Sequence, residues 1–129
     1  MMDTKTAKFE TEKTRALGLG SSRSGTEHHW HMLVSSILMC VAVPAFLIVF
    51  AMGLGGSHAE AAAFYGQPLP AIILALCWFV IIRHVMNEAL EAIEDYVHGT
   101  TGQLTQVATT TFSYILMAVG LFALARLAI

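Results

Sequence analysis

Four polar side chains recur at helical spacing in the middle of an apolar stretch. The first is His84, and it is followed after four, seven and eleven positions by Glu88, Glu91 and Asp95. At about 100° per residue they fall within about 40° of one another and form one narrow polar stripe on a helix. Tyr96 follows at roughly 120° from the stripe. The pattern predicts a cofactor ligand, His84, on a helix that leads to a reaction site at Asp95 and Tyr96.

His84 is predicted to lie deep in a membrane. It follows Pro70 by 14 positions and precedes Tyr96 by 12, so at 1.5 Å per residue it is roughly 20 Å from either end of the helix. A neutral imidazole at that depth is a satisfied structural group, a member of a proton relay or an axial ligand of haem iron. Because the other histidines lie near predicted interfaces, a second axial ligand is expected from a partner; they are His28, His29, His31, His58 and His98.

Asp95 and Tyr96 stand where the helix leaves the membrane. A phenol beside a carboxylate, close to a membrane-embedded cleft, can hydrogen-bond and protonate a quinone. The plainer alternative is that this half of the helix faces protein and water. That alternative accounts for Glu88 and Glu91 better than for the Asp95–Tyr96 pair.

The composition predicts an integral membrane protein that is entirely α-helical. The chain has 129 residues, of which 56% are hydrophobic and 12% charged, against about 25% charged in soluble domains. Apolar segments predict three spans, at about 30–54, 69–97 and 104–127, each long enough for about 30 Å of hydrocarbon. Segments 57–70 and 99–103 are expected to be loops, and the polar tail 1–23 is assigned no fold. Ser35 and Ser36 are expected to bond back to their own helix.

The distribution of charge predicts the orientation. Five of the seven Lys and Arg residues precede the first span and none lies in the loop 55–68, which places the N-terminus and the Tyr96 end of the second span in the cytoplasm. The net charge of −2 does not suggest nucleic acid. Since the N-terminus has neither an apolar signal region nor the composition of a transit peptide, a bacterial inner membrane is expected. Three helices are too few to wrap a cofactor, so a partner subunit or self-association is also expected.

Two stretches carry a family resemblance. The first begins at His84, in the pattern H-x11-Y-V, and ends in Ile93-Glu94-Asp95-Tyr96-Val97-His98-Gly99. The second, before the first span, is Ser24-Gly25-Thr26-Glu27-His28-His29-Trp30. From about Gly18 to the C-terminus the chain resembles the hydrophobic membrane anchor of succinate dehydrogenase, the D subunit of respiratory complex II, in its alphaproteobacterial form.

The resemblance implies a six-helix bundle formed with a second anchor (C) subunit, docked to an iron–sulfur subunit and a flavoprotein subunit in the lipid membrane. It implies that His84 is one axial ligand of haem b and that Tyr96 and Asp95 bind ubiquinone. His28 is expected to approach a haem propionate, although Val34 stands where some members have an arginine. On this interpretation the chain is not catalytic alone; it serves electron transport from the tricarboxylic acid cycle to the respiratory chain.

Other classes of protein remain open at this stage. A small proton-coupled transporter could use the His84-Glu88-Glu91-Asp95 stripe as a relay. A haem-b anchor of another membrane oxidoreductase, of the fumarate reductase or formate dehydrogenase type, would share the mid-membrane histidine. A purely structural anchor without haem would keep the same spans.

Overall fold

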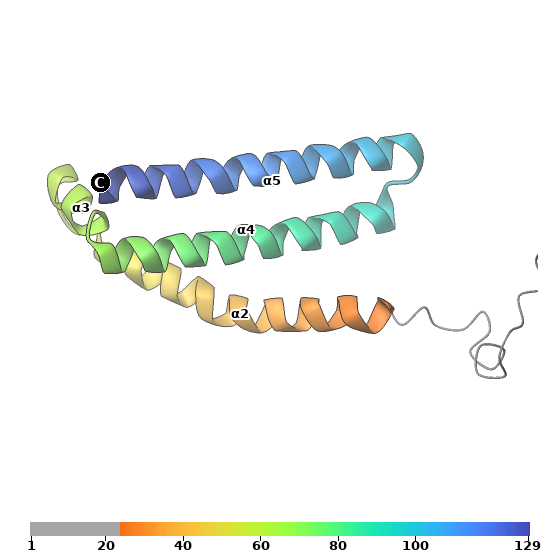
Figure 1. Ribbon diagram of the computed structural model, residues 1–129, viewed down its shortest axis with the longest axis horizontal. Coiled ribbons are helices and arrows are strands. Elements are labelled where there is room, and N and C mark those ends of the chain that lie inside the picture. The colour runs from red at the N-terminus through yellow and green to blue at the C-terminus, as the bar shows by residue number, and fades with distance from the viewer. Residues whose placement is uncertain (1–23) are drawn as a thin grey trace, which may run out of the picture. The chain divides into compact units, whose positions relative to one another are not determined.

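The computed structural model describes residues 24–129, and this part of the chain is helical. The helices are α2 (Ser24–Met52), α3 (His58–Tyr65), α4 (Pro68–Tyr96) and α5 (Gly99–Ala128) (Figure 1). The predicted tail, 1–23, lies outside the described residues. The chain divides into two units, 1–31 and 32–129. In the first unit, residues 26–31 form early turns of α2 and are exposed; the arrangement described below is that of the second.

Within residues 24–129, three helices are long and apolar enough to cross a membrane. They cover Thr26–Met52, Pro68–Tyr96 and Gly99–Ala128. Helices satisfy every interior backbone donor and acceptor within the segment, which hydrocarbon demands. Many large apolar side chains of these helices point outward, as Ile37, Leu76 and Phe122 do, which is typical of helices that lie in lipid and not in water. The prediction of an all-α protein with three spans is confirmed.

The predicted outer loop 57–70 was wrong in part, because it contains α3. Ser57 caps this helix: its hydroxyl accepts from the Glu60 N–H at 3.4 Å, and its own N–H donates to the Glu60 carboxylate at 2.7 Å. This reciprocal capping box stabilises the first turn of an alanine-rich segment. The prolines and glycines nearby suggested a loop and obscured the signal.

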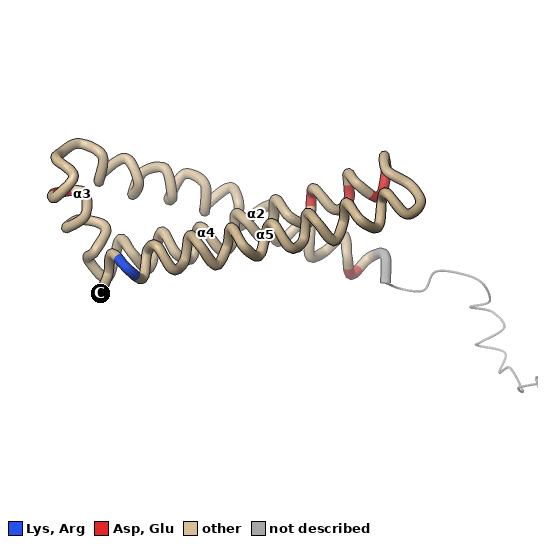
Figure 2. The backbone as a smooth tube through the Cα atoms, turned by 90° about the horizontal axis from the view of Figure 1, so that it is seen from above, with Lys and Arg blue, Asp and Glu red and all other residues tan. Residues whose placement is uncertain are grey.

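The predicted loop 99–103 is also helical, since α5 begins at Gly99. Only Val97 and His98, both extended, separate it from α4. Gly99 has φ +73°, a left-handed conformation that glycine adopts without a Cβ penalty. Gly102 is buried where a Cβ would meet the carbonyl oxygen of Val97. These glycines therefore permit a tight turn instead of a longer loop, and α4 and α5 run antiparallel side by side (Figures 1 and 2).

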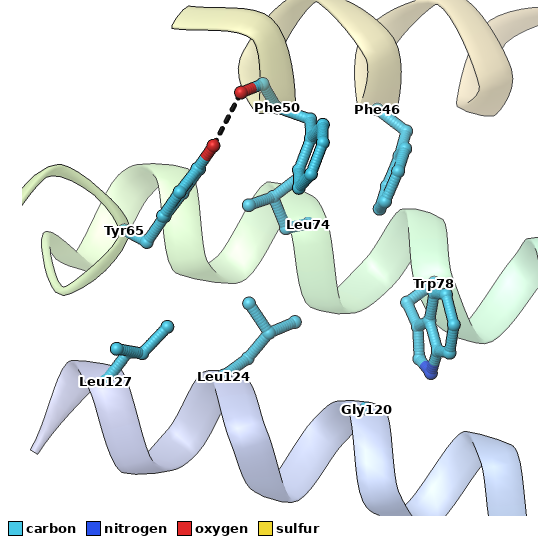
Figure 3. A pocket seen from close by; sticks show the side chains of 8 residues that line it. All are labelled: Phe46, Phe50, Tyr65, Leu74, Trp78, Gly120, Leu124 and Leu127. Carbon is cyan, nitrogen blue, oxygen red and sulfur yellow. Dashed lines mark hydrogen bonds between the residues drawn. The ribbon is translucent and has the colours of Figure 1, made fainter. Parts of the chain in front are cut away.

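Trp78 fixes the packing of α4 against α5. Its indole N–H donates to the carbonyl of Leu116 at 3.3 Å, and its ring fills the space that a Cβ on Gly120 would need. On the other side, the ring of Phe46 from α2 lies 6.4 Å from the indole, centroid to centroid. Trp78 thus contacts both other spans (Figure 3).

Tyr65 ties α3 to the end of α2. Its hydroxyl donates to the carbonyl of Phe50 at 2.6 Å, and the two rings stack with centroids 5.9 Å apart. The same carbonyl also accepts from the backbone N–H of Gly53 at 3.2 Å, so Tyr65 adds a second hydrogen bond at the end of α2. Beside it lies an apolar cavity of about 270 Å³ (Figure 3), lined by Phe46, Phe50, Tyr65, Leu74, Trp78, Gly120, Leu124 and Leu127.

The Trp78–Gly120 contact predicts that Gly120→Ala destabilises the protein. The new methyl group would overlap the indole, which cannot move without losing its hydrogen bond to Leu116. Overpacking of this kind costs about 1–3 kcal/mol, more than alanine gains in helix propensity. The midpoint of thermal unfolding, followed by near-ultraviolet circular dichroism in mild detergent, should fall. Gly55→Ala is the matched control, since nothing lies within 4 Å of its added Cβ; an equal midpoint in both variants would contradict the prediction.

Candidate functional site

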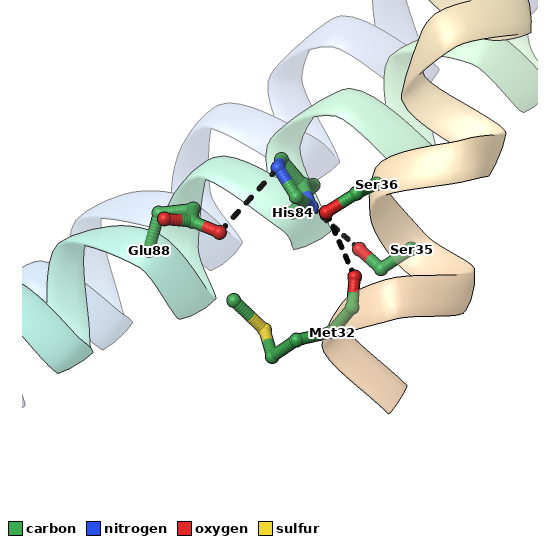
Figure 4. A network of polar contacts seen from close by, with 5 residues as sticks. All are labelled: Met32, Ser35, Ser36, His84 and Glu88. Carbon is green, nitrogen blue, oxygen red and sulfur yellow. Dashed lines mark hydrogen bonds and ion pairs between the residues drawn. The ribbon is translucent and has the colours of Figure 1, made fainter. Parts of the chain in front are cut away.

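His84 lies inside the membrane-spanning part of α4 and points toward α2 (Figure 4). Its side chain is only 13% exposed. The ring nitrogen Nδ1 is 2.5 Å from the hydroxyl oxygen of Ser35 on α2. The hydrogen bond joins α2 to α4 through two residues that are 49 positions apart in the sequence. It gives the largely buried imidazole a polar partner.

The second ring nitrogen of His84 is differently placed. Nε2 lies 3.7 Å from the carboxylate oxygen Oε1 of Glu88, one helical turn along α4. That distance is too long for a hydrogen bond, and the Glu88 side chain is 52% exposed. When Nδ1 carries the ring proton and donates to Ser35, Nε2 keeps a lone pair that can bind a metal.

The two adjacent serines of α2 have different roles. Ser36 donates to the carbonyl of Met32 at 2.8 Å, within its own helix. For Ser35 the sequence-based expectation of a bond back to its own helix was wrong, because its hydroxyl faces His84. The positions of the two residues along their spans could have indicated this contact. Ser35 follows the start of its span at Thr26 by nine positions, and His84 precedes the end of its span at Tyr96 by twelve, so the two lie at similar depths.

The acidic residues of α4 gather toward its C-terminal end (Figure 2). Glu88 and Asp95 are exposed, whereas Glu91 is half-buried. Glu94, on another face, accepts a hydrogen bond from the amide of Gln106 on α5 at 3.4 Å. The stripe that begins at the buried His84 therefore becomes accessible toward the helix end.

Asp95 and Tyr96 form the last positions of α4, before the chain turns extended at Val97. Both are exposed, and Tyr96 is 84% exposed. Twelve residues of helix separate Tyr96 from His84, which corresponds to about 18 Å. The two predicted chemistries consequently occupy two places on one helix: an imidazole within the span and an accessible phenol with a carboxylate at its end.

His28 lies on an early turn of α2 and is exposed. It belongs to the unit that ends at His31, whereas His84 belongs to the unit 32–129.

A metal held by protein side chains alone has no candidate among residues 24–129. No group of three or more His, Cys, Asp or Glu side chains in this range could hold a metal ion. His84 instead offers one nitrogen from a buried, hydrogen-bonded ring. That donor suits a metal whose other ligands come from a macrocycle or another subunit.

Known proteins resemble this chain over most of its length. Residues 7–125 match the family model of the succinate dehydrogenase/fumarate reductase transmembrane subunit. The succinate dehydrogenase hydrophobic membrane anchor subunit of Paracoccus denitrificans is 36% identical over 120 residues, which cover 93% of each chain. No solved structure matches.

The match extends over nearly the whole length of both proteins, and it confirms the resemblance predicted from the residues around His84 and Tyr96. The three helices of residues 24–129 that are long and apolar enough to cross a membrane agree with a membrane anchor. The chain belongs to the succinate dehydrogenase/fumarate reductase transmembrane subunits, as a succinate dehydrogenase hydrophobic membrane anchor subunit.

Proposed function

We propose that this anchor subunit serves a succinate:ubiquinone oxidoreductase by giving haem b one axial ligand, His84, and by completing the site at which ubiquinone is reduced. The observation that carries the proposal is the buried imidazole inside a membrane span, with Nδ1 hydrogen-bonded to Ser35. A bound haem supplies a centre that takes up and releases one electron. The part of this chain is to present Nε2 in a fixed direction.

An apolar groove lies about one helical turn from His84, toward the N-terminal end of α4. This groove of about 180 Å³ runs between α2 and α4 and includes Leu38, Ala42, Cys77 and Val80. Val80 lies one turn before His84, and Leu38 lies one turn after Ser35. Small side chains at positions 42 and 77 leave room beside the helices, and the apolar walls would exclude water from the metal ligand.

Partner subunits would complete the bundle. Large apolar side chains on the outer faces of the spans are exposed in the single chain, among them Ile37, Val41 and Phe79. We expect a second anchor subunit to cover part of this surface, to form a six-helix bundle and to donate the other axial ligand. Lipid would cover the rest. An iron–sulfur subunit and a flavoprotein subunit would dock at the end of the bundle nearest Tyr96.

Tyr96 and Asp95 would contribute to the quinone site. The phenol can donate a hydrogen bond to a ubiquinone carbonyl, and the neighbouring carboxyl group can position it or supply a proton. Both side chains are accessible at the end of α4, where a partner surface could close over them.

The orientation follows the positive charge of the N-terminal region, which favours a cytoplasmic N-terminus in a bacterial inner membrane. Tyr96 would then lie on the cytoplasmic side, where a soluble dehydrogenase delivers its electrons. His28, at the same predicted interface, would contact a haem propionate, with partner residues replacing the arginine that some family members have at the position of Val34.

A proton-relay function has one observation in its favour. Glu88 lies 3.7 Å from Nε2 of His84, so a proton could pass between them through a small rotation or one water. Family membership favours the anchor function over a transporter. A haem spectrum discriminates between the two, because a ring whose Nε2 binds iron cannot exchange a proton there.

Replacement of His84 tests the haem assignment. His84→Ala removes the proposed ligand, so the complex purified in mild detergent should lose or alter its low-spin haem b bands. The measurement is the dithionite-reduced minus oxidised visible spectrum. His58→Ala, which removes an exposed histidine of α3, is the control and should leave the bands unchanged. A wild-type spectrum in His84→Ala would eliminate His84 as the ligand.

Replacement of Tyr96 tests the quinone assignment. Tyr96→Phe deletes one hydrogen bond of about 1 kcal/mol, so kcat/KM for ubiquinone reduction should fall roughly fivefold. Succinate oxidation with a soluble dye should stay intact, because that reaction bypasses the membrane site. Tyr114→Phe removes another exposed hydroxyl, on α5, and should change neither rate. Equal quinone kinetics in wild type and Tyr96→Phe would refute the role.

A further inference from the structure

We infer that Ser35 is a positioning residue for haem binding: its hydroxyl accepts a hydrogen bond from Nδ1–H of His84, and thereby fixes the tautomer and the ring direction that present Nε2 to iron. This inference rests on the proposed role of His84 as a ligand. It assigns a function to the interior of α2, where the only other proposed haem contact on this helix is His28 on an early turn.

The geometry supports a directed contact. The separation of 2.5 Å between Oγ and Nδ1 is that of a close hydrogen bond, and it joins α2 to α4 within a region where the imidazole is largely buried. A buried donor has few alternative partners, so the ring is held at one of its two nitrogens. Rotation about its χ2 angle would break the bond, and the direction of Nε2 is therefore restricted.

The direction of the bond follows from the chemistry of the ligand. A serine hydroxyl can either donate to an imidazole nitrogen or accept from it. If Ser35 donated to Nδ1, a neutral ring would carry its proton on Nε2, which could then not bind a metal. Ligation through Nε2 therefore requires Nδ1–H to be the donor and Ser35 to be the acceptor.

Ser36 provides an internal comparison. It is adjacent to Ser35 on the same helix, but its hydroxyl bonds to the carbonyl of Met32, one turn back. Ser36 is exposed, whereas Ser35 is half-buried. Removal of the Ser36 hydroxyl thus changes helix composition and side-chain size at almost the same depth without changing the partner of His84.

The contact also has an electronic consequence. An imidazole that donates from Nδ1–H is a more basic ligand at Nε2. A more basic ligand stabilises the oxidised, more positively charged iron. Loss of the Ser35 acceptor should therefore raise the reduction midpoint of the haem and weaken its retention. A serine that only packs between the helices would not shift the midpoint in this direction when it is replaced by residues of similar size.

The test compares Ser35→Ala, Ser35→Cys, Ser35→Thr and Ser36→Ala in the complete detergent-purified complex. Haem release is measured as transfer to excess apomyoglobin, and the midpoint is measured by redox titration of the visible bands. In Ser35→Ala, haem release should accelerate about 10- to 100-fold, as loss of such outer-shell partners lowers metal-site affinity. The midpoint should shift upward. Ser35→Cys, a close match in size with a weaker acceptor, should shift it in the same direction, whereas Ser35→Thr should restore wild-type values and Ser36→Ala should keep them.

The outcomes separate this inference from the function on which it rests. Wild-type release and midpoint in both Ser35→Ala and Ser35→Cys, in a complex that loses haem when His84 is replaced, would overturn the role of Ser35 alone. A wild-type spectrum in His84→Ala would overturn the ligand assignment itself. If Ser35→Ala fails to assemble, Ser35→Cys and Ser35→Thr decide: an upward shift in the first and none in the second supports the inference, and identical values contradict it.

Discussion

An imidazole placed in the middle of an apolar span must find a polar partner, because water is absent there and an unsatisfied buried donor costs about 1–3 kcal/mol. His84 meets this requirement through Ser35 on α2. The bond restricts the relative sliding of α2 and α4 at that depth, since displacement by one residue would turn either side chain to another face of its helix.

A second group of contacts between helices lies toward the other end of α4, around Trp78. There the contacts are aromatic: Trp78 packs between Phe46 and the space above Gly120, and its indole N–H is satisfied by a carbonyl of α5. Tyr65 likewise places its hydroxyl on a backbone carbonyl, that of Phe50 in α2, which also accepts from Gly53. Both aromatic side chains combine a large apolar surface with one polar atom that finds a partner, which is how such residues are accommodated in a low-dielectric setting. Helix α4 thus contacts its neighbours at two places along its length, His84 and Trp78.

The architecture leaves the functional end of α4 less constrained. Past His84 the helix becomes acidic and accessible, and it ends in the exposed Asp95 and Tyr96. The left-handed Gly99 then reverses the chain within a very short connection. Within residues 24–129 the connection after Tyr96 is only two residues long, and the phenol is exposed there. The proposed quinone site thus depends on what the chain omits there as much as on the residues it supplies.

The helical class, the three spans and the choice of His84, Asp95 and Tyr96 as candidates could all be predicted from the sequence. Hydropathy measures the cost of placing each segment in hydrocarbon, and helical spacing fixes which side chains share a face. These are local properties of the chain. The helix α3 was also encoded locally, by Ser57 and Glu60, and was missed because nearby prolines and glycines received more weight.

Other features were decided only by the tertiary structure. Either of two neighbouring serines could have bonded to its own helix, and only the packing of α2 against α4 shows that Ser35 faces His84 while Ser36 does not. Gly120 likewise could be assigned a packing role from its small size, but its partner, Trp78, could not be identified. Such pairings depend on the rotation and depth of one helix relative to another. Those quantities arise from the summed contacts of whole helices, and no local pattern of residues records them.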